Sequence, residues 1–312
     1  MALTKGTKNM DFAICLWDLD IEPAMQEQIF EGVSAVEPGA PVLSDTDRDL
    51  LQAQAEMLRG RNIEIYSAHA PFGPEHDLSS SDSEKRDGAV QSTLLALRNA
   101  ALIGAQCVVL HPGPPVPTEQ RSARWDNLRE SIEHLLPKAE ELEVALALEN
   151  LLPGYLGDQT ISLRKFVDRF DSSLLGFCFD TGHAHLNDEG VMQAFEVLRE
   201  DIINFHIQDN DGWMDRHIQP PYGTIDWDAL APELRSLDFE HPFALETLPW
   251  GRAGSTQMLR EIRTLFKYGA LRIDTEHGPV RPVCHECGHY RFGTAESWFC
   301  ACREGGTHGN SS

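Results

Sequence analysis

The sequence has no long apolar run and relatively few cationic residues. No stretch of the 312 residues approaches the roughly 18 apolar residues of a membrane span, and "MALTKGTKNMDFAICLW" lacks the apolar core of a signal peptide. We therefore expect a cytoplasmic protein with no membrane partner. Lysine and arginine number 26 against 49 acids, which gives a net charge of -23. Because nucleic-acid binding depends on cationic neutralisation of phosphates, a nucleic-acid partner is not expected.

The sequence also lacks the G-x-G-x-x-G and P-loop motifs of nucleotide-binding sheets. It contains instead short apolar runs that alternate with segments of helical periodicity. We predict eight strands, at 12–17, 33–37, 63–69, 107–111, 144–149, 174–180, 202–206 and 243–246. Near-continuous apolar strands separated by helices indicate a parallel sheet buried on both faces. Eight of them over about 250 residues favour an α/β fold of the (β/α)8 TIM barrel type, with an open doubly wound sheet as the alternative.

Cysteine is scarce until the C-terminus. Three of the seven cysteines lie in predicted strands, where they are expected to be small buried side chains: Cys15, Cys107 and Cys178. The other four follow a change of composition near residue 272, where prolines, glycines and paired cysteines replace the strand and helix pattern. We therefore predict a barrel over 1–272, a small appendage over 273–304 and a disordered end over 305–312.

The appendage carries a Cys-x2-Cys pair and a Cys-x-Cys pair separated by a twelve-residue, hairpin-like spacer. The four residues are Cys284, Cys287, Cys300 and Cys302. Four thiolates at this spacing predict a structural zinc ribbon that serves folding or docking, and a redox pair is the alternative. Such a module could also contribute to a homo-oligomer contact.

Six successive predicted strands, the third to the eighth, end in a histidine or a carboxylate. In chain order these residues are His69, His111, Glu149, Asp180, His206 and Glu246. Because the C-terminal ends of barrel strands meet around one mouth, we expect these side chains to converge there. Imidazole and carboxylate ligands suit zinc, manganese, cobalt or iron, so the pattern predicts a divalent-metal centre. Its predicted core is Glu149, Asp180, His206 and Glu246.

Three further candidates lie close to these in the sequence. His183 follows Asp180 in "DTGH", and Asp215 and His217 alternate in "DRH", so they would share a face of an extended segment. Each of these, like His69 and His111, could bind either metal or substrate. Asp209 and Asp211 in the same loop are predicted to be turn residues.

The strand-end segments together resemble a known superfamily. In order, "HAPFGPEHDLSSSD", "VVLHPG", "LALEN", "FDTGHAH", "FHIQDN", "DRH" and "ALE" are similar to motifs of the xylose isomerase-like barrels. These include sugar isomerases, sugar epimerases and endonuclease IV, and the resemblance covers about residues 12 to 270. In the isomerase and epimerase branch it implies one divalent metal on the four core residues. It also implies that Glu149 and Glu246 transfer a proton through an enediolate while His183 orients a hydroxyl.

The endonuclease IV branch of the same resemblance implies three zinc ions and nine ligands. All nine positions have a matching residue: His69, His111, Glu149, Asp180, His183, His206, Asp215, His217 and Glu246. Three features of the sequence depart from the endonuclease IV pattern and favour sugar chemistry. The loops above the strands are acidic, "NLLPGYLGDQT" after Glu149 differs from the small-residue nuclease motif, and "PYGTIDW" resembles the G-x-G-x-I-D-W segment of sugar isomerase-like members.

These features predict a divalent-metal isomerase or epimerase that acts on a sugar or sugar phosphate, with Glu149 and Glu246 as catalytic residues. The predicted substrate-binding residues are His69, His111, His183, Trp17, Trp213 and Arg216. The two tryptophans could stack on a sugar, and Arg216 is the nearest counterpart of an arginine that some epimerases use. The alternative is a trinuclear zinc phosphodiesterase acting on abasic DNA. A third hypothesis is a catalytically silent barrel that docks a protein through its zinc tail.

Overall fold

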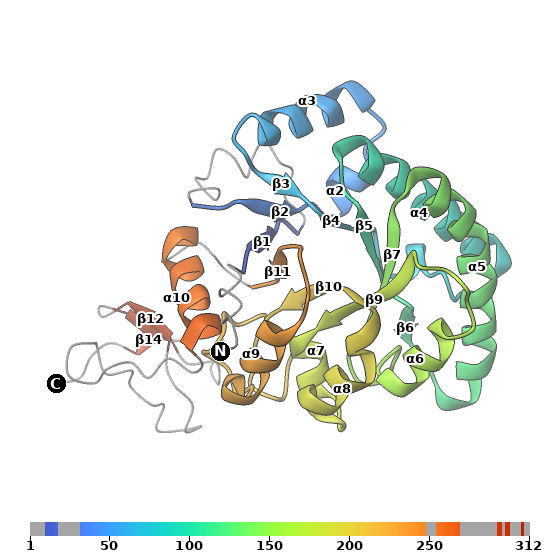
Figure 1. The fold of residues 1–312 in the computed structure, drawn as a ribbon. Coiled ribbons are helices and arrows are strands. Elements are labelled where there is room, and N and C mark those ends of the chain that lie inside the picture. The colour runs from blue at the N-terminus through green and yellow to red at the C-terminus, as the bar shows by residue number, and fades with distance from the viewer. Residues whose placement is uncertain are drawn as a thin grey trace, which may run out of the picture.

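Parallel strands at the centre and helices around them form the main body of the structure (Figure 1). The computed structural model describes residues 10–17, 32–247 and 254–268, and three short strands at 292–294, 297–299 and 307–308. The central strands are β1 (Phe12–Cys15), β2 (Ala35–Glu37), β3 (Glu64–Ile65), β4 (Ser67–His69), β5 (Cys107–Leu110), β7 (Ala145–Glu149), β9 (Leu175–Asp180), β10 (Ile202–Ile207) and β11 (Phe243–Leu245). All eight predicted strands are present, the third of them as the two pieces β3 and β4.

The sheet closes at this divided third strand. Its order is β3-β2-β1-β11-β10-β9-β7-β5-β4, and neighbouring strands are parallel. β3 pairs with β2, with Ile65 opposite Val36, whereas β4 pairs with β5, with Ser67 opposite Cys107. Tyr66 alone separates β3 from β4 in the chain, so the two ends of the sheet are one continuous segment. The fold is therefore a nearly closed TIM barrel, as predicted, and not an open doubly wound sheet.

Helices cover the outer face of the barrel (Figure 1). They are α3 (Arg48–Arg59), α4 (Ser83–Ile103), α5 (Arg121–Leu142), α6 (Thr160–Val167), α8 (Gly190–Leu198), α9 (Trp227–Ser236) and α10 (Gly254–Tyr268), with the short α2 (Ala40–Leu43) and α7 (Thr181–Leu186) at strand ends. Asp47, Asp82 and Asp226 accept backbone N–H groups at the starts of α3, α4 and α9, which satisfies donors that a helix leaves unpaired. Within the described part of the chain, no helix has both the length and the apolar character needed to cross a membrane.

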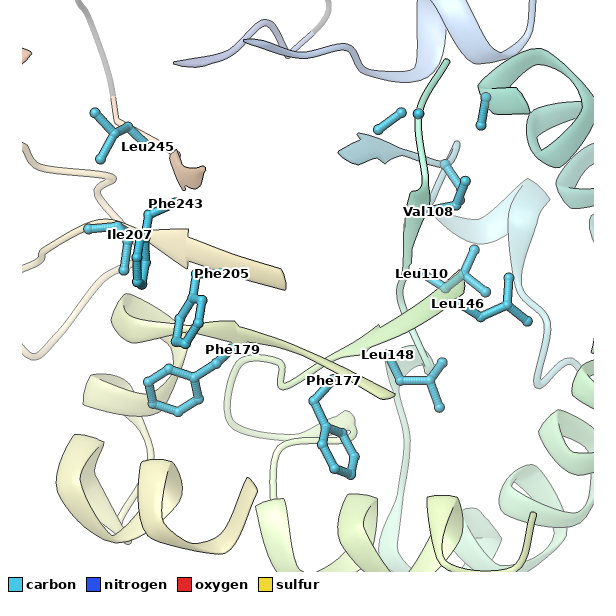
Figure 2. Packing of buried hydrophobic residues seen from close by; sticks show 14 of the residues in the cluster. Val108, Leu110, Leu146, Leu148, Phe177, Phe179, Phe205, Ile207, Phe243 and Leu245 are labelled. Atoms are coloured by element: carbon cyan, nitrogen blue, oxygen red, sulfur yellow. The ribbon is translucent and has the colours of Figure 1, made fainter. Parts of the chain in front are cut away.

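Alternation along the strands separates the helix-facing core from the barrel interior. On β9, Phe177 and Phe179 point toward the helices (Figure 2), and both are fully buried in the main apolar cluster. Cys178 and Asp180 therefore face the other way, into the barrel. The same alternation turns inward three polar residues: Glu149 at the end of β7, His206 next to the end of β10, and Glu246 directly after β11. The hydrophobic pattern of the strands thus determines where the site residues point.

Small side chains fill the barrel below these polar residues. One interior cluster contains Cys107, Val109, Ala147 and Cys178 beside Tyr66, and another contains Cys15 with three alanines. The three cysteines predicted to be buried are buried and free. The side chains of both clusters are buried, and in such barrels the chemistry lies at the C-terminal ends of the strands.

The cysteine-rich tail is described only in part. β12 (Phe292–Thr294), β13 (Ser297–Phe299) and β14 (Thr307–His308) form a small antiparallel sheet. β12 and β13 fall within the spacer between Cys287 and Cys300. The four predicted zinc ligands, Cys284, Cys287, Cys300 and Cys302, lie outside the described residues. The zinc ribbon and the boundaries near 272 and 304 therefore stay predictions.

Candidate active site

Glu149 lies among four imidazoles at the C-terminal end of the barrel. Its Oε2 is 3.2 Å from Nε2 of His111 and 3.5 Å from Nε2 of His69. Its Oε1 is 3.1 Å from Nδ1 of His183 and 3.2 Å from Nδ1 of His206. Each carboxylate oxygen thus faces a different pair of histidines. A carboxylate in this position can bridge two neighbouring groups of ligands.

Two candidate ligand groups share Glu149. In one, ligand atoms of Glu149, Asp180, His206 and Glu246 all lie within 4.8 Å of one another. In the other group, ligand atoms of Glu149, His69 and His111 also lie within 4.8 Å of one another. The first group is the metal core predicted from the strand ends, and its four residues are buried or nearly so. Mixed carboxylate and imidazole donors at this separation suit a divalent transition metal.

Asp215 joins two further histidines at the cavity wall. Its Oδ2 lies 3.0 Å from Nε2 of His217 and 3.4 Å from Nε2 of His183. Gln208 connects this outer group with the core, because its Nε2 donates to Oδ1 of Asp215 at 2.9 Å and to Oδ1 of Asp180 at 3.3 Å. The nine residues named by the endonuclease-type resemblance therefore lie in one connected cluster.

Backbone carbonyls orient three of the histidines. The Nδ1 of His69 lies 2.7 Å from the carbonyl oxygen of Ala70, that of His183 lies 3.0 Å from Asn150, and that of His217 lies 2.9 Å from Glu246. A proton on each Nδ1 satisfies these contacts and leaves the lone pair on Nε2. In all three residues Nε2 faces a carboxylate of the cluster. Asp180 adds a further restraint, because it caps α7 by accepting the N–H of His183 at 2.6 Å.

Glu37 is a site residue that the sequence analysis missed. It lies at the end of β2, is 2% exposed, and its Oε1 is 2.9 Å from Nε2 of His206. Its Oε2 accepts from Ser67 Oγ and Asn204 Nδ2. The signal was present, because Glu37 ends the second predicted strand, "VSAVE", as the other acids end theirs. The predicted strand-end residues begin only with His69 on the third strand.

Burial and neighbouring carboxylates oppose ionisation of Asp180, whereas neighbouring imidazoles favour ionisation of Glu246. Burial raises the pKa of Asp180 to about 8; nearby Glu246 and Glu149 raise it too, while His183 opposes the shift. Burial also tends to raise the pKa of Glu246, but His206 and His217 outweigh it and bring that pKa to about 2. Neighbouring carboxylates in a buried site are stabilised by added cationic charge.

Two buried oxygens test whether a metal fits this site. Oε2 of Glu149 and Oε2 of Glu246 have no hydrogen-bond partner within the described ranges, although imidazole nitrogens lie 3.2–3.5 Å away. A buried carboxylate oxygen without a hydrogen-bond donor destabilises the folded protein, so we expect another group, such as a cation, to contact it. Both oxygens belong to the candidate ligand groups. The residues present therefore fit a divalent cation.

The cluster opens into a cavity of about 450 Å³. Trp17, Phe72 and Tyr155 contribute aromatic walls. The ring of Phe72 stacks on His111 with centroids 4.5 Å apart, and Trp17 meets His217 edge-on at 4.6 Å. A cavity of this volume with polar groups at its base matches the sites that proteins provide for small molecules.

Two predicted substrate-binding residues lie away from this cavity. Trp213 is 86% exposed and is not among the described residues that line it. Arg216 is also absent from that lining, and its Nε pairs with Oδ2 of Asp211 at 2.6 Å. In contrast, Trp17, His69, His111 and His183 line the cavity. Substrate contacts by these four residues are proposed below, and the predicted roles of Trp213 and Arg216 stay predictions.

Asp209 organises the loop that carries Asp215 and His217. Its Oδ1 accepts the N–H groups of Asn210 and Ile225, and its Oδ2 accepts those of Gly223 and the Trp227 indole, all at 2.8–3.1 Å. Burial raises the pKa of Asp209 to about 6, although the N–H donors lower it. Gly223 is required at this contact, because a Cβ there would lie 2.2 Å from Oδ1 of Asp209.

We expect Asp209→Ala to destabilise the protein by about 3–5 kcal/mol, because it leaves four N–H donors without their acceptor in a buried loop. Asp211→Ala is the matched control, since Asp211 accepts two backbone N–H groups in the same loop but is closer to solvent. We expect it to cost about 1 kcal/mol. Urea unfolding at neutral pH measures both, and equal losses for the two variants would contradict this role of Asp209.

Curated relatives match the barrel part of the chain. The uncharacterised proteins y4fM from Sinorhizobium fredii and MJ1311 from Methanocaldococcus jannaschii are each 29% identical, over 190 and 196 residues. These matches cover 58% and 61% of this chain and 61% and 66% of the two relatives, so the chain spans less than two thirds of their length. A probable endonuclease 4 from Mycoplasmoides gallisepticum is 24% identical over 198 residues, which cover 59% of this chain and 65% of that protein.

Solved structures share the fold. A D-tagatose 3-epimerase-like protein superposes with a TM-score of 0.70 at 24% identity and covers 85% of this chain and 99% of its own. The TTHB071 protein from Thermus thermophilus, soaked with ZnCl2, gives a TM-score of 0.63 at 28% identity, covering 80% and 97%. The family model described as xylose isomerase-like TIM barrel matches residues 30–266. This chain therefore belongs to the xylose isomerase-like TIM-barrel family.

Proposed function

We propose that the protein is a divalent-metal-dependent isomerase or epimerase of a small sugar or sugar phosphate. The observation that carries this proposal is the aromatic-walled cavity of about 450 Å³ with Glu149 and Glu246 both among its lining residues. A sugar ring fits such a volume, and flat rings such as those of Trp17 and Phe72 pack against its apolar face. The net charge of -23 also favours a small substrate over a nucleic acid.

In this proposal the metal is held by Glu149, Asp180, His206 and Glu246. A bound divalent ion would polarise a carbonyl and stabilise the negative charge that develops when the neighbouring carbon loses its proton. Glu149 and Glu246 supply the two carboxylates needed to remove that proton and return it. His183 is placed to orient a hydroxyl, because it lines the cavity and its Nδ1 is held by Asn150. Zinc, manganese, cobalt and iron all suit this donor set.

A second candidate is a trinuclear phosphodiesterase that acts on abasic DNA. Two observations favour it: Glu149 presents one oxygen to each of two histidine pairs, and Asp215 with His183 and His217 forms a third group. The sequence similarity to a probable endonuclease 4 also favours it. This candidate needs all three groups to hold an ion at once.

Counting the barrel metals distinguishes the two candidates. The predicted tail zinc is removed from the count by the double substitution Cys284→Ser and Cys287→Ser. We expect about one divalent ion per barrel by mass spectrometry of the intact native protein, and no cleavage of abasic DNA above a protein-free control. About three ions together with cleavage of abasic DNA would support the phosphodiesterase instead.

A further inference from the structure

His206 differs from the other oriented histidines of the cluster in the group that holds it. His69, His183 and His217 each have Nδ1 against a backbone carbonyl. His206 is reversed: its Nε2 lies 2.9 Å from Oε1 of Glu37, and its Nδ1 faces the cluster. His206 is the one of these four whose Nε2 is held by Glu37, and Nδ1 of His183, although held by a carbonyl, also lies 3.1 Å from Oε1 of Glu149. The interaction of His206 with Glu37 is therefore charge-assisted, which makes it stronger than a contact of the same length with a neutral carbonyl.

The hydrogen bonds around Glu37 fit a residue that orients His206. Four donors occupy its two oxygens: His206 Nε2 and Cys15 Sγ on Oε1, and Ser67 Oγ and Asn204 Nδ2 on Oε2. Cys15, Glu37 and His206 lie close enough to be a metal group of their own. That arrangement would displace the donors that already satisfy this buried carboxylate, so orienting His206 fits the observed contacts better.

We propose that Glu37 is a positioning residue for the metal centre. It accepts the Nε2–H of His206 and so fixes the tautomer whose Nδ1 lone pair points at Glu149 and Glu246, which lie 3.2 Å and 3.3 Å away. A carboxylate on the outer nitrogen also makes the imidazole a more basic ligand. Ser67 and Asn204 hold the carboxylate in place from β4 and β10. This inference rests on the proposed metal centre and does not depend on the substrate.

Zinc affinity tests this role without an activity assay. Glu37→Gln keeps the shape of the side chain but removes its charge, and we expect it to weaken zinc binding to the core site by about 10- to 100-fold in competition with a chromogenic chelator. Ser67→Ala is the matched control. It removes one donor from Glu37 and leaves the contact with His206, so we expect a change within about threefold. Affinity within twofold of wild type for a folded Glu37→Gln protein would overturn the proposal.

The tautomer of His206 provides a second test on the unaltered protein. In the zinc-loaded, 15N-histidine-labelled wild type, we expect the His206 resonance, assigned by its loss in His206→Gln, to show a proton on Nε2 and zinc on Nδ1. A proton on Nδ1 would overturn the proposal even if Glu37→Gln does not fold. If the zinc-loaded wild type turns over no sugar, the proposed function fails. The affinity and tautomer measurements still decide the role of Glu37.

Discussion

We expect Glu149→Gln to lose most of the barrel metal and at least about 10³-fold of the activity. Glu149 contacts four histidines and is a member of two candidate metal-ligand groups. The neutral amide would remove the negative charge that a divalent cation requires and would turn an N–H group toward imidazole nitrogens or the metal. It would also remove one of the two carboxylates proposed to transfer the proton.

Glu189→Gln is the matched control for this substitution. Glu189 accepts the N–H and Oγ–H of Thr160 at the start of α6, so the change in charge is the same but lies outside the cluster. Elemental analysis of the dialysed proteins measures metal content, and turnover of the identified substrate measures activity. If Glu149→Gln held as much metal as Glu189→Gln, the assignment of Glu149 as a shared ligand would be contradicted.

Removal of the metal should lower thermal stability substantially. Without the cation, buried carboxylates such as Glu149 and Asp180 remain close together, and Oε2 of Glu149 has no hydrogen-bond donor among the residues described. A ligand at 100 times its dissociation constant stabilises the native state by about 2.7 kcal/mol, which for a domain of this size corresponds to a shift in Tm of roughly 5–10 °C. We expect chelation to cause a loss of that size and added zinc to reverse it.

The tail must be separated from the barrel in this experiment. The Cys284→Ser and Cys287→Ser protein removes the predicted tail site, so the remaining shift reports the barrel metal alone. Adding Glu149→Gln to it should abolish most of that shift, because the shared ligand is lost. A Tm that does not respond to chelator or to zinc in the Cys-substituted protein would argue against a metal centre in the barrel.

The fold and most of the cluster could be predicted because both follow from local patterns. Apolar runs such as "LLGFCFD" identify strands, and alternation from Phe177 and Phe179 fixes the direction of Asp180. Closure of the barrel then brings the strand ends to one mouth, so residues distant in sequence converge without any knowledge of their contacts. The division of the third strand at Tyr66 was not predicted. It depends on which neighbouring strand each half pairs with.

Contacts between distant side chains could not be predicted in the same way. Glu37 and His206 are 169 residues apart, and their hydrogen bond depends on the register of the strands and the rotation of one imidazole. The choice of Nδ1 or Nε2 as the nitrogen facing the cluster has no sequence signal. Trp213 was predicted to contact substrate as an aromatic residue beyond a strand end, and Arg216 as the counterpart of an epimerase arginine; neither is among the described residues that line the cavity. Loop conformation, which Asp209 and Gly223 determine, decides such positions.

Proton exchange with solvent tests the central proposal most directly. The metal-loaded wild-type protein would be incubated in deuterated water with a panel of ketoses, aldoses and their phosphates, and deuterium at the carbon next to the carbonyl would be measured by mass spectrometry and NMR. We expect incorporation into at least one sugar, and its loss in Glu149→Gln and Glu246→Gln. The proposed function would be contradicted if the protein holds its barrel metal and cleaves abasic DNA but incorporates no deuterium into any sugar of the panel.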